Sequence, residues 1–156
     1  GLPFLLVRLA SRQALARATL NRSVWARHLA GSPAAHLFLF TDGAKGHDVQ
    51  ARMFAPGGGV EEDPATGSAA AALGGWLGST SPMTDGTISC VIAQGLEIGR
   101  PSRLEVEVQK RAGAVVAVRV GGAAVLVSEG TIEAPGDARP RPEAAARAAI
   151  MTEGVE

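Results

Sequence analysis

The chain has 156 residues and carries 15 Lys and Arg against 15 Asp and Glu, so its formal net charge at pH 7 is zero. A chain without excess positive charge lacks the attraction that drives binding to nucleic acid or to an anionic membrane surface. Charged residues make up 19% and hydrophobic residues 46%, unlike a disordered chain, and the apolar runs are too short to span a membrane. We therefore expect a soluble globular domain with neither nucleic acid nor membrane as a partner.

The chain starts with an apolar run. Residues 2–9 are rich in Leu, Phe and Val and predict a strand. Ser11 then offers an N-cap to a helix that carries Leu15 on its inner face, and a second short helix around Trp25 is expected before Gly31. No secretory pattern of a basic start and an apolar stretch is present, which favours a cytoplasmic location. Because the chain begins with Gly1 rather than Met, we expect that a segment upstream of it has been removed or is missing.

Two further runs predict a pair of antiparallel strands. Residues 36–41 are almost continuously apolar, and residues 48–54 alternate apolar with polar side chains. The turn sequence at 42–46 between them predicts a hairpin with a loop. Residues 56–66 follow with three consecutive glycines, two prolines and an acidic triplet, and this composition predicts a loop.

The next segment predicts a helix without a polar face. Residues 67–77 read Gly-Ser-Ala-Ala-Ala-Ala-Leu-Gly-Gly-Trp-Leu. A helix that is apolar all round has to be enclosed, and small side chains let its surroundings approach closely. We therefore expect strands to bury the helix on all sides.

Such strands are predicted downstream. The runs are residues 87–93, 103–109, 115–120 and 123–128, with the last two joined as a hairpin through Gly121-Gly122. Together with the earlier runs they make about seven strands, enough to curl around one thin helix. The predicted fold class is α+β, a β-barrel-like mixed sheet wrapped around a central apolar helix.

The C-terminal part has a different composition. From residue 135 onward the chain consists largely of Pro, Arg, Ala and Glu, with few large apolar side chains. We interpret residues 1–132 as the folded barrel domain and residues 133–156 as a surface or disordered tail.

The segment around the apolar helix also carries the candidate chemistry. Free amides and the positive end of the helix dipole favour an anion at the helix start, where Gly67 allows close approach and Ser68 adds a hydroxyl donor. Asp63 stands directly before these groups, and no P-loop Lys accompanies them, so a phosphate is disfavoured. A small carboxylate, with Asp63 carrying a proton, fits better. The structural alternative is that Asp63 or Thr66 only caps the helix.

The residues in this region carry a family resemblance. Arg-Met-Phe-Ala-Pro at 52–56, followed by Glu-Asp-Pro-Ala-Thr-Gly-Ser-Ala at 62–69, resembles the motif in the second half of the PhzF-like (phenazine biosynthesis) isomerases. Gln-Gly-Leu-Glu-Ile-Gly-Arg-Pro-Ser at 94–102 resembles the next motif of that family, and Gly-Leu-Pro at 1–3 resembles the entry to the same half. The resemblance covers roughly residues 1–132.

The resemblance implies a diaminopimelate-epimerase-like fold of two similar halves, of which this chain would be the C-terminal one. It implies a substrate site between the halves, with Asp63 and Ser68 as catalytic residues and Thr66, Gly67 and Gly95 as substrate-binding residues. The family's main proton-transferring glutamate and an assisting histidine belong to the first half, which this sequence lacks. The implied activity is cofactor-independent isomerisation of a small substrate with a carboxylate, without a metal, in a homodimer.

Two alternatives remain open at this stage. Epimerases and racemases of the same fold use paired cysteines, one of them at the start of this helix, where this chain has Thr66. A threonine hydroxyl is too weak an acid to exchange a C–H proton at neutral pH, whereas a carboxylate can do so when burial raises its pKa. The second alternative is a binding or partner domain that is catalytically silent because the N-terminal half is missing.

Overall fold

The structure is a computed structural model that describes residues 2–132. The chain divides into two compact units, residues 1–124 and 125–156, and all helices and strands of the described residues lie in the first. The predicted tail at 133–156 lies outside the described residues. In chain order the elements are β1 (Phe4–Arg8), α1 (Arg12–Arg17), α2 (Arg22–His28), β2 (His36–Asp42), β3 (Val49–Ala55), the short 3-10 helix η1 (Pro56–Gly58), β4 (Val60–Asp63), α3 (Gly67–Thr80), β5 (Gly86–Gln94), β6 (Ser102–Arg111) and β7 (Ala114–Gly122).

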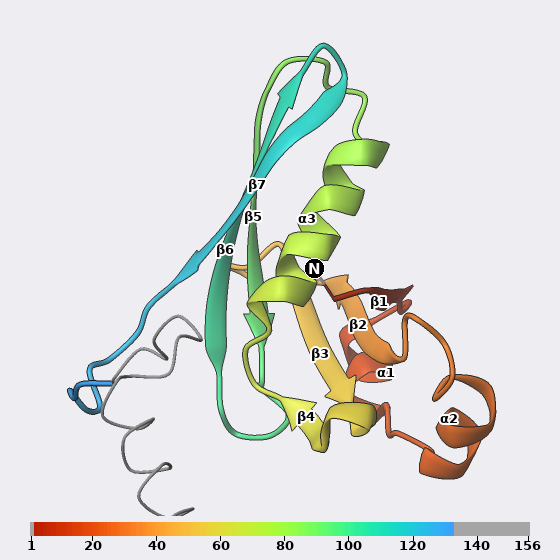
Figure 1. The fold of residues 1–156 in the computed structure, drawn as a ribbon. Coiled ribbons are helices and arrows are strands. Elements are labelled where there is room, and N and C mark those ends of the chain that lie inside the picture. The colour runs from red at the N-terminus through yellow and green to blue at the C-terminus, as the bar shows by residue number, and fades with distance from the viewer. Residues whose placement is uncertain (1, 133–156) are drawn as a thin grey trace, which may run out of the picture. The chain divides into compact units, whose positions relative to one another are not determined.

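The strands of the first unit form one curled, mixed sheet in the order β1-β2-β3-β5-β6-β7, with β4 beside β3. The β1–β2 and β3–β5 pairs are parallel and the other pairs are antiparallel. Figure 1 shows α3 lying along the part of the sheet made by β5, β6 and β7. The predicted α+β class, with a curled sheet around one apolar helix, is confirmed.

Strand β3 has two different neighbours along one edge. Its first residues, 49–51, pair in parallel with residues 92–94 of β5, whereas Met53 and Ala55 pair with β4. The end of β5 and the end of β4 are therefore both anchored on β3. This fork brings together two segments that lie about thirty residues apart in the sequence, and the candidate site is built there.

Small residues let α3 approach the sheet closely. A Cβ atom added at Gly74 would lie 2.6 Å from a methyl group of Val106, and one added at Gly78 would lie 2.7 Å from methyl groups of Val108 and Val115. Leu73 of the same helix is fully buried in the core cluster. The glycines of the apolar helix are thus explained by packing.

The expectation that strands bury α3 on all sides is wrong for the described residues. Trp76 is 42% exposed, although the edge of its ring contacts Phe40. The sheet curls over one side of the helix only, because its edge strands β1 and β7 do not meet. The strands among residues 2–132 consequently leave one apolar side of α3, which includes Trp76, partly exposed.

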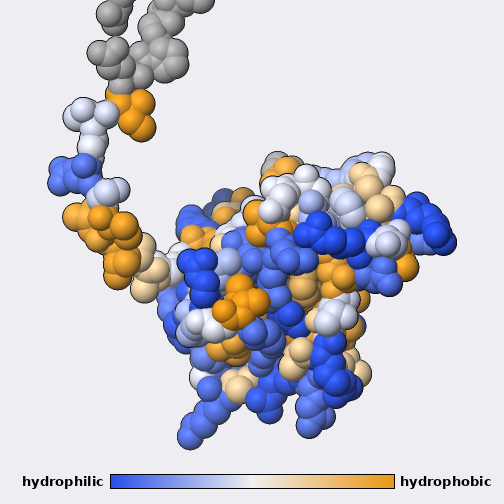
Figure 2. All heavy atoms as spheres, turned by 90° about the horizontal axis from the view of Figure 1, so that it is seen from below, coloured by the Kyte–Doolittle hydropathy of each residue, from blue (hydrophilic) through white to orange (hydrophobic). Residues whose placement is uncertain are grey.

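On the opposite face of the sheet, α1 packs against β2 and β3 and buries Leu15, whereas α2 buries none of its residues. Phe38 and Phe40 of β2 belong to the core cluster, whereas Leu37 and Leu39, which alternate with them, line a pocket together with Trp25 of α2. Helix α1 begins as predicted, since the Ser11 hydroxyl accepts a hydrogen bond from the Ala14 amide at 3.1 Å. Figure 2 shows the lower face of the molecule, where hydrophilic side chains are interspersed with smaller apolar patches.

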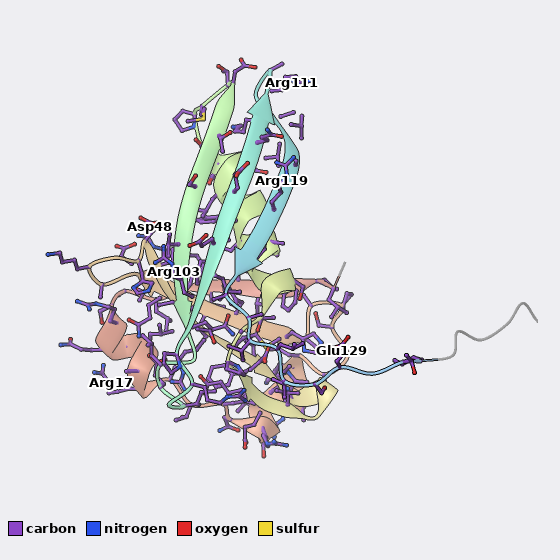
Figure 3. All side chains as sticks on the ribbon, turned by 90° about the vertical axis from the view of Figure 1, so that its left-hand side faces the viewer. Arg17, Asp48, Arg103, Arg111, Arg119 and Glu129 are labelled. Atoms are coloured by element: carbon purple, nitrogen blue, oxygen red, sulfur yellow. The ribbon has the colours of Figure 1, made fainter. Side chains whose placement is uncertain are left out.

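The outward face of the β5–β7 region is polar. Strand β6 buries Leu104, Val106 and Val108 and exposes Glu105 and Glu107, as its alternating sequence predicts. Arg119 of β7, labelled in Figure 3, lies 3.4 Å from Glu107 on this face, away from α3. No helix of the described residues is long and apolar enough to cross a membrane.

Two strand predictions need correction. The hairpin predicted at Gly121-Gly122 does not form, because β7 runs to Gly122 and residues 123–132 contain no strand. The actual turn lies at Ala112-Gly113, where both residues have positive φ angles. Conversely, β4 forms within the segment predicted to be a loop. The described residues therefore contain seven strands, the number expected, but β4 takes the place of the strand predicted at residues 123–128.

Candidate functional site

Asp63, Thr66 and Gly67 define the start of α3. Strand β4 ends at Asp63, a short turn follows, and the helix begins at Gly67 with Thr66 as its N-cap. Although Thr is a common capping residue, the Thr66 hydroxyl makes no hydrogen bond to a helix amide; it donates to Oδ2 of Asp63 at 2.6 Å. The interpretation of Asp63 or Thr66 as a simple helix cap therefore does not match the geometry.

The first amides of α3 are available to a ligand. Gly67 and Ser68 are exposed, and among the described residues no hydrogen-bond acceptor faces their backbone N–H groups. Space around Gly67 is open, since an added Cβ would meet no atom within 4 Å. Free amides at a helix start form a ready-made anion site. The predicted anion-binding groups thus lie beside the Asp63 carboxylate.

The side chain of Gln94 holds the turn between β4 and α3 in place. The sequence analysis did not identify it as a site residue. Its side chain is fully buried at the end of β5. Its Oε1 accepts from the Thr66 amide at 3.2 Å, and its Nε2 donates to the Asp63 carbonyl at 2.6 Å and to the Thr66 hydroxyl at 2.9 Å. One glutamine therefore fixes both ends of the turn that joins β4 to α3.

Gly95 lies next to this turn. It has φ +78°, a left-handed conformation that favours glycine, and an added Cβ would lie 2.9 Å from the Pro64 carbonyl oxygen. The turn after β5 closes through a hydrogen bond from the Arg100 amide to the Gly95 carbonyl at 2.9 Å. The structure thus gives Gly95 a packing role against the first motif, and its contact with substrate stays a prediction.

A buried ion pair supports β4 from the other side. Arg52 of β3 and Glu62 of β4 form two hydrogen bonds, at 2.8 Å and 2.6 Å, with both side chains less than 10% exposed. Because the guanidinium of Arg52 donates these hydrogen bonds to the Glu62 carboxylate, they raise the pKa of Arg52 above its ordinary value. Arg52 also donates to the carbonyls of Leu15 and Ala18 at the end of α1. Glu62 lies in the segment that was predicted to be a loop, but it belongs to β4 and its side chain is buried.

A recess of about 550 Å³ adjoins the helix start. Ala65 and Gly67 form one wall, residues 101–104 another, and residues 120–123 a third. Arg103 is the charged residue of this lining. Within residues 2–132 no group of three or more His, Cys, Asp or Glu side chains is arranged to hold a metal ion. The polar groups in and beside this recess are backbone amides, hydroxyls, the Asp63 carboxylate and the Arg103 guanidinium.

Comparison with known proteins identifies the family of this chain. The sequence model of a family described as "Phenazine biosynthesis-like protein" (PhzC-PhzF) matches residues 1–130. The chain belongs to this family. The resemblance seen in the two motifs is thereby confirmed over nearly the whole of the folded part.

The relatives in this family align with half or more of this chain, and each of them is longer than it. An uncharacterized isomerase of Mesorhizobium japonicum is 36% identical over 138 residues, which is 85% of this chain and 45% of the relative. A trans-2,3-dihydro-3-hydroxyanthranilate isomerase of Pseudomonas chlororaphis is 41% identical over 87 residues, 56% of this chain and 31% of the relative. The crystal structure of a PhzF-family protein of Bacillus anthracis superimposes with a TM-score of 0.62 at 21% identity, over 78% of this chain and 46% of that one. The chain spans less than half the length of these relatives.

Proposed function

We propose that this chain is the C-terminal half of a PhzF-like isomerase that moves a proton on a small substrate with a carboxylate. The observation that carries the proposal is the pairing of an oriented Asp63 carboxylate with the free amides of Gly67 and Ser68 at one helix start. The names of the relatives, which include several isomerases, support the same reaction class. Their length supports a site completed by a second half.

Each group has a distinct role in the proposed reaction. The amides of Gly67 and Ser68, with the Ser68 hydroxyl, bind the substrate carboxylate through hydrogen bonds and the helix dipole. Asp63 has one oxygen engaged by Thr66 and presents the other to a proton on the substrate. A carboxylate can take up and return a proton within hydrogen-bond reach of the reacting carbon. A second proton-transferring group would come from the complementary half, because among residues 2–132 Asp63 is the one carboxylate that hydrogen-bonds within this turn.

The first test compares the chain alone with the completed protein. The substrate is trans-2,3-dihydro-3-hydroxyanthranilate, chosen from the name of the Pseudomonas relative. The complementary half comes from the Mesorhizobium japonicum relative, fused or added in trans. We expect incorporation of solvent deuterium into the substrate by the completed protein and none by residues 1–156. Isomerisation by this chain alone would place the chemistry elsewhere.

Variants of the completed protein then separate binding from proton transfer. Asp63→Asn keeps the shape but removes the titrating group, so deuterium exchange should fall by about 10²- to 10⁴-fold, the usual loss of general acid–base catalysis. Ser68→Ala removes one donor and leaves the amides, so it should mainly raise KM. A fully active Asp63→Asn protein would contradict the assigned role. Homodimer formation and a cytoplasmic location stay predictions.

A racemase with two cysteines is the less favoured alternative. Thr66, at the position of one of those cysteines, is 7% exposed, and its hydroxyl proton is directed at Asp63. It therefore cannot approach a substrate C–H group as a base. The second alternative, a partner domain that is silent because the N-terminal half is missing, is tested by the intact mass of the native polypeptide. A native mass close to that of residues 1–156 would favour the partner domain, and a mass about twice as large would favour the proposed isomerase.

A further inference from the structure

We infer that Gln94 is a positioning residue for the proposed proton transfer, acting on Asp63 through the hydroxyl of Thr66. The inference rests on the proposed function of Asp63 and goes beyond it, since Gln94 touches neither the helix amides nor the open side of the carboxylate. The three residues come from three elements: Gln94 ends β5, Asp63 ends β4 and Thr66 caps α3.

The hydrogen-bond directions in this cluster follow from chemistry. The Thr66 amide can only donate, so the atom of Gln94 that faces it, at 3.2 Å, has to be Oε1. The Asp63 carbonyl can only accept, so the atom that faces it, at 2.6 Å, has to be Nε2. Two backbone groups of opposite kind thus fix the orientation of the Gln94 amide.

The orientation of Gln94 in turn fixes the Thr66 hydroxyl. Nε2 also donates to Oγ1 of Thr66 at 2.9 Å, so this oxygen accepts from Gln94 and its own proton is directed elsewhere. The acceptor for that proton is Oδ2 of Asp63 at 2.6 Å. The relay runs in one direction, from the Gln94 amide to the Thr66 hydroxyl to the Asp63 carboxylate, and it leaves Oδ1 of Asp63 for the substrate.

Burial makes the relay rigid. Gln94 is 0% exposed and Thr66 is 7% exposed, so water does not compete for these hydrogen bonds. The backbone of Gln94 is held on both sides, by Ala51 of β3 and Ser102 of β6. A side chain that only filled the core or satisfied the turn would need no particular hydroxyl direction at residue 66, and this difference makes the inference testable.

Thr66→Val and Gln94→Met break the relay at different points. Valine has the shape of threonine without the hydroxyl and leaves the bonds of Gln94 to the backbone intact, whereas methionine removes all three bonds of Gln94. Thr66→Ser keeps a hydroxyl and is the rescue variant. Gln109→Met, at a half-buried glutamine of β6 outside the cluster, is the matched control.

The first measurement needs no activity. In this chain, the carboxyl ¹³C signal of Asp63 should shift in Thr66→Val and in Gln94→Met and stay in place in Thr66→Ser and Gln109→Met. An unmoved signal in Thr66→Val overturns the inference, even if Gln94→Met fails to fold. Because it is independent of turnover, this result remains decisive if Asp63→Asn proves fully active and the proposed function falls.

The second measurement uses the completed enzyme. Displacing a reacting group by about 1 Å costs up to about 100-fold in rate, so kcat should fall by about 10- to 100-fold in Thr66→Val and in Gln94→Met, with KM changed by less than about threefold. Members of one relay are not additive, so the double variant should be no slower than the slower single variant. If the kcat losses of the two single variants multiply in the double variant, or if Thr66→Ser loses as much kcat as Thr66→Val, then Gln94 and Thr66 have independent structural roles.

Discussion

Cys90 illustrates how the environment of a single residue sets its chemistry. The thiol is 6% exposed on β5, and burial, together with the nearby Asp48 carboxylate, raises its pKa from 9.0 to about 11. Both causes disfavour the charged thiolate, which is the nucleophilic form. Cys90 is therefore a buried thiol that reacts slowly at neutral pH.

This pKa predicts slow alkylation of Cys90. At pH 8 the shift lowers the thiolate fraction about 100-fold, so iodoacetamide should modify the native chain at least that much more slowly than the chain unfolded in urea. Mass spectrometry over time measures both rates. Equal rates for the native and unfolded chain would show that Cys90 is neither buried nor shifted.

The Arg52–Glu62 pair is the second residue-scale prediction. Glu62→Gln leaves the guanidinium of Arg52 buried without its counter-charge, which typically costs about 3–5 kcal/mol of unfolding free energy. Glu61→Gln is the matched control, since Glu61 meets Arg22 in an exposed pair worth less than about 1 kcal/mol. Urea unfolding of both variants provides the comparison. A similar small effect in both would show that the pair does not brace β4.

At the scale of elements, α3 shows what patterning predicts and what it leaves out. The apolar sequence at 67–77 predicts a helix in contact with strands, and Gly74 and Gly78 meet the valines of β6 and β7 as expected. The sequence does not show that α3 is enclosed on all sides. It indicates which faces of the helix are apolar, but not which strands or which other part of a protein bury each face. Trp76 on the uncovered side shows this limit.

Neighbouring glycines of α3 provide a stability prediction. A Cβ at Gly74 would clash with Val106, so Gly74→Leu should lower the unfolding free energy by about 1–3 kcal/mol or more through overpacking. Gly75 has no atom within 4 Å of a built Cβ, so Gly75→Ala should raise it by about 0.5–1 kcal/mol through helix propensity. Thermal unfolding measures both changes. Equal signs for the two variants would contradict the packing of this face.

The failed hairpin at Gly121-Gly122 has a physical reason. A glycine pair is a local turn signal, but the two residues pair with Glu105 and Leu104 of β6 and thus extend the register that starts at Arg111 and Ala114. Long-range pairing over the whole of β6 outweighs the local preference. The true turn at Ala112-Gly113 carries one glycine and a weaker signal.

At the scale of the whole molecule, the candidate site combines predictable parts with a contact that no spacing indicates. Asp63, Thr66, Gly67 and Ser68 are adjacent in sequence, so a helix-start pattern locates them. Gln94 lies 28 residues beyond Thr66 and joins them only because β3 pairs with both β4 and β5. The available signals were its polarity at an inward position of a buried strand and its place as the first residue of the second motif.

The uncovered side of α3 yields a prediction about the complete protein. The chain spans less than half of its relatives, and the proposed function places a second half at the start of α3, so we expect that half to cover Trp76 as well. A buried indole emits at shorter wavelength than one in contact with water. In a Trp25→Phe variant, Trp76 is the only tryptophan of this chain. When this variant joins a complementary half that contains no tryptophan, the emission of Trp76 should shift to shorter wavelength.

The control variant keeps the other tryptophan, Trp25, and removes Trp76. In Trp76→Phe the remaining Trp25 lines a pocket with Leu37 and Leu39 on the opposite face of the sheet, and its indole N–H donates to the Ala35 carbonyl, so its emission should not change when the halves join. A blue shift of Trp25 with a constant Trp76 would place the second half on the α2 face. In that case the amides of Gly67 and Ser68 would be open to water in the complete protein, and carboxylate binding there would lose the exclusion of solvent that strengthens hydrogen bonds in an active site.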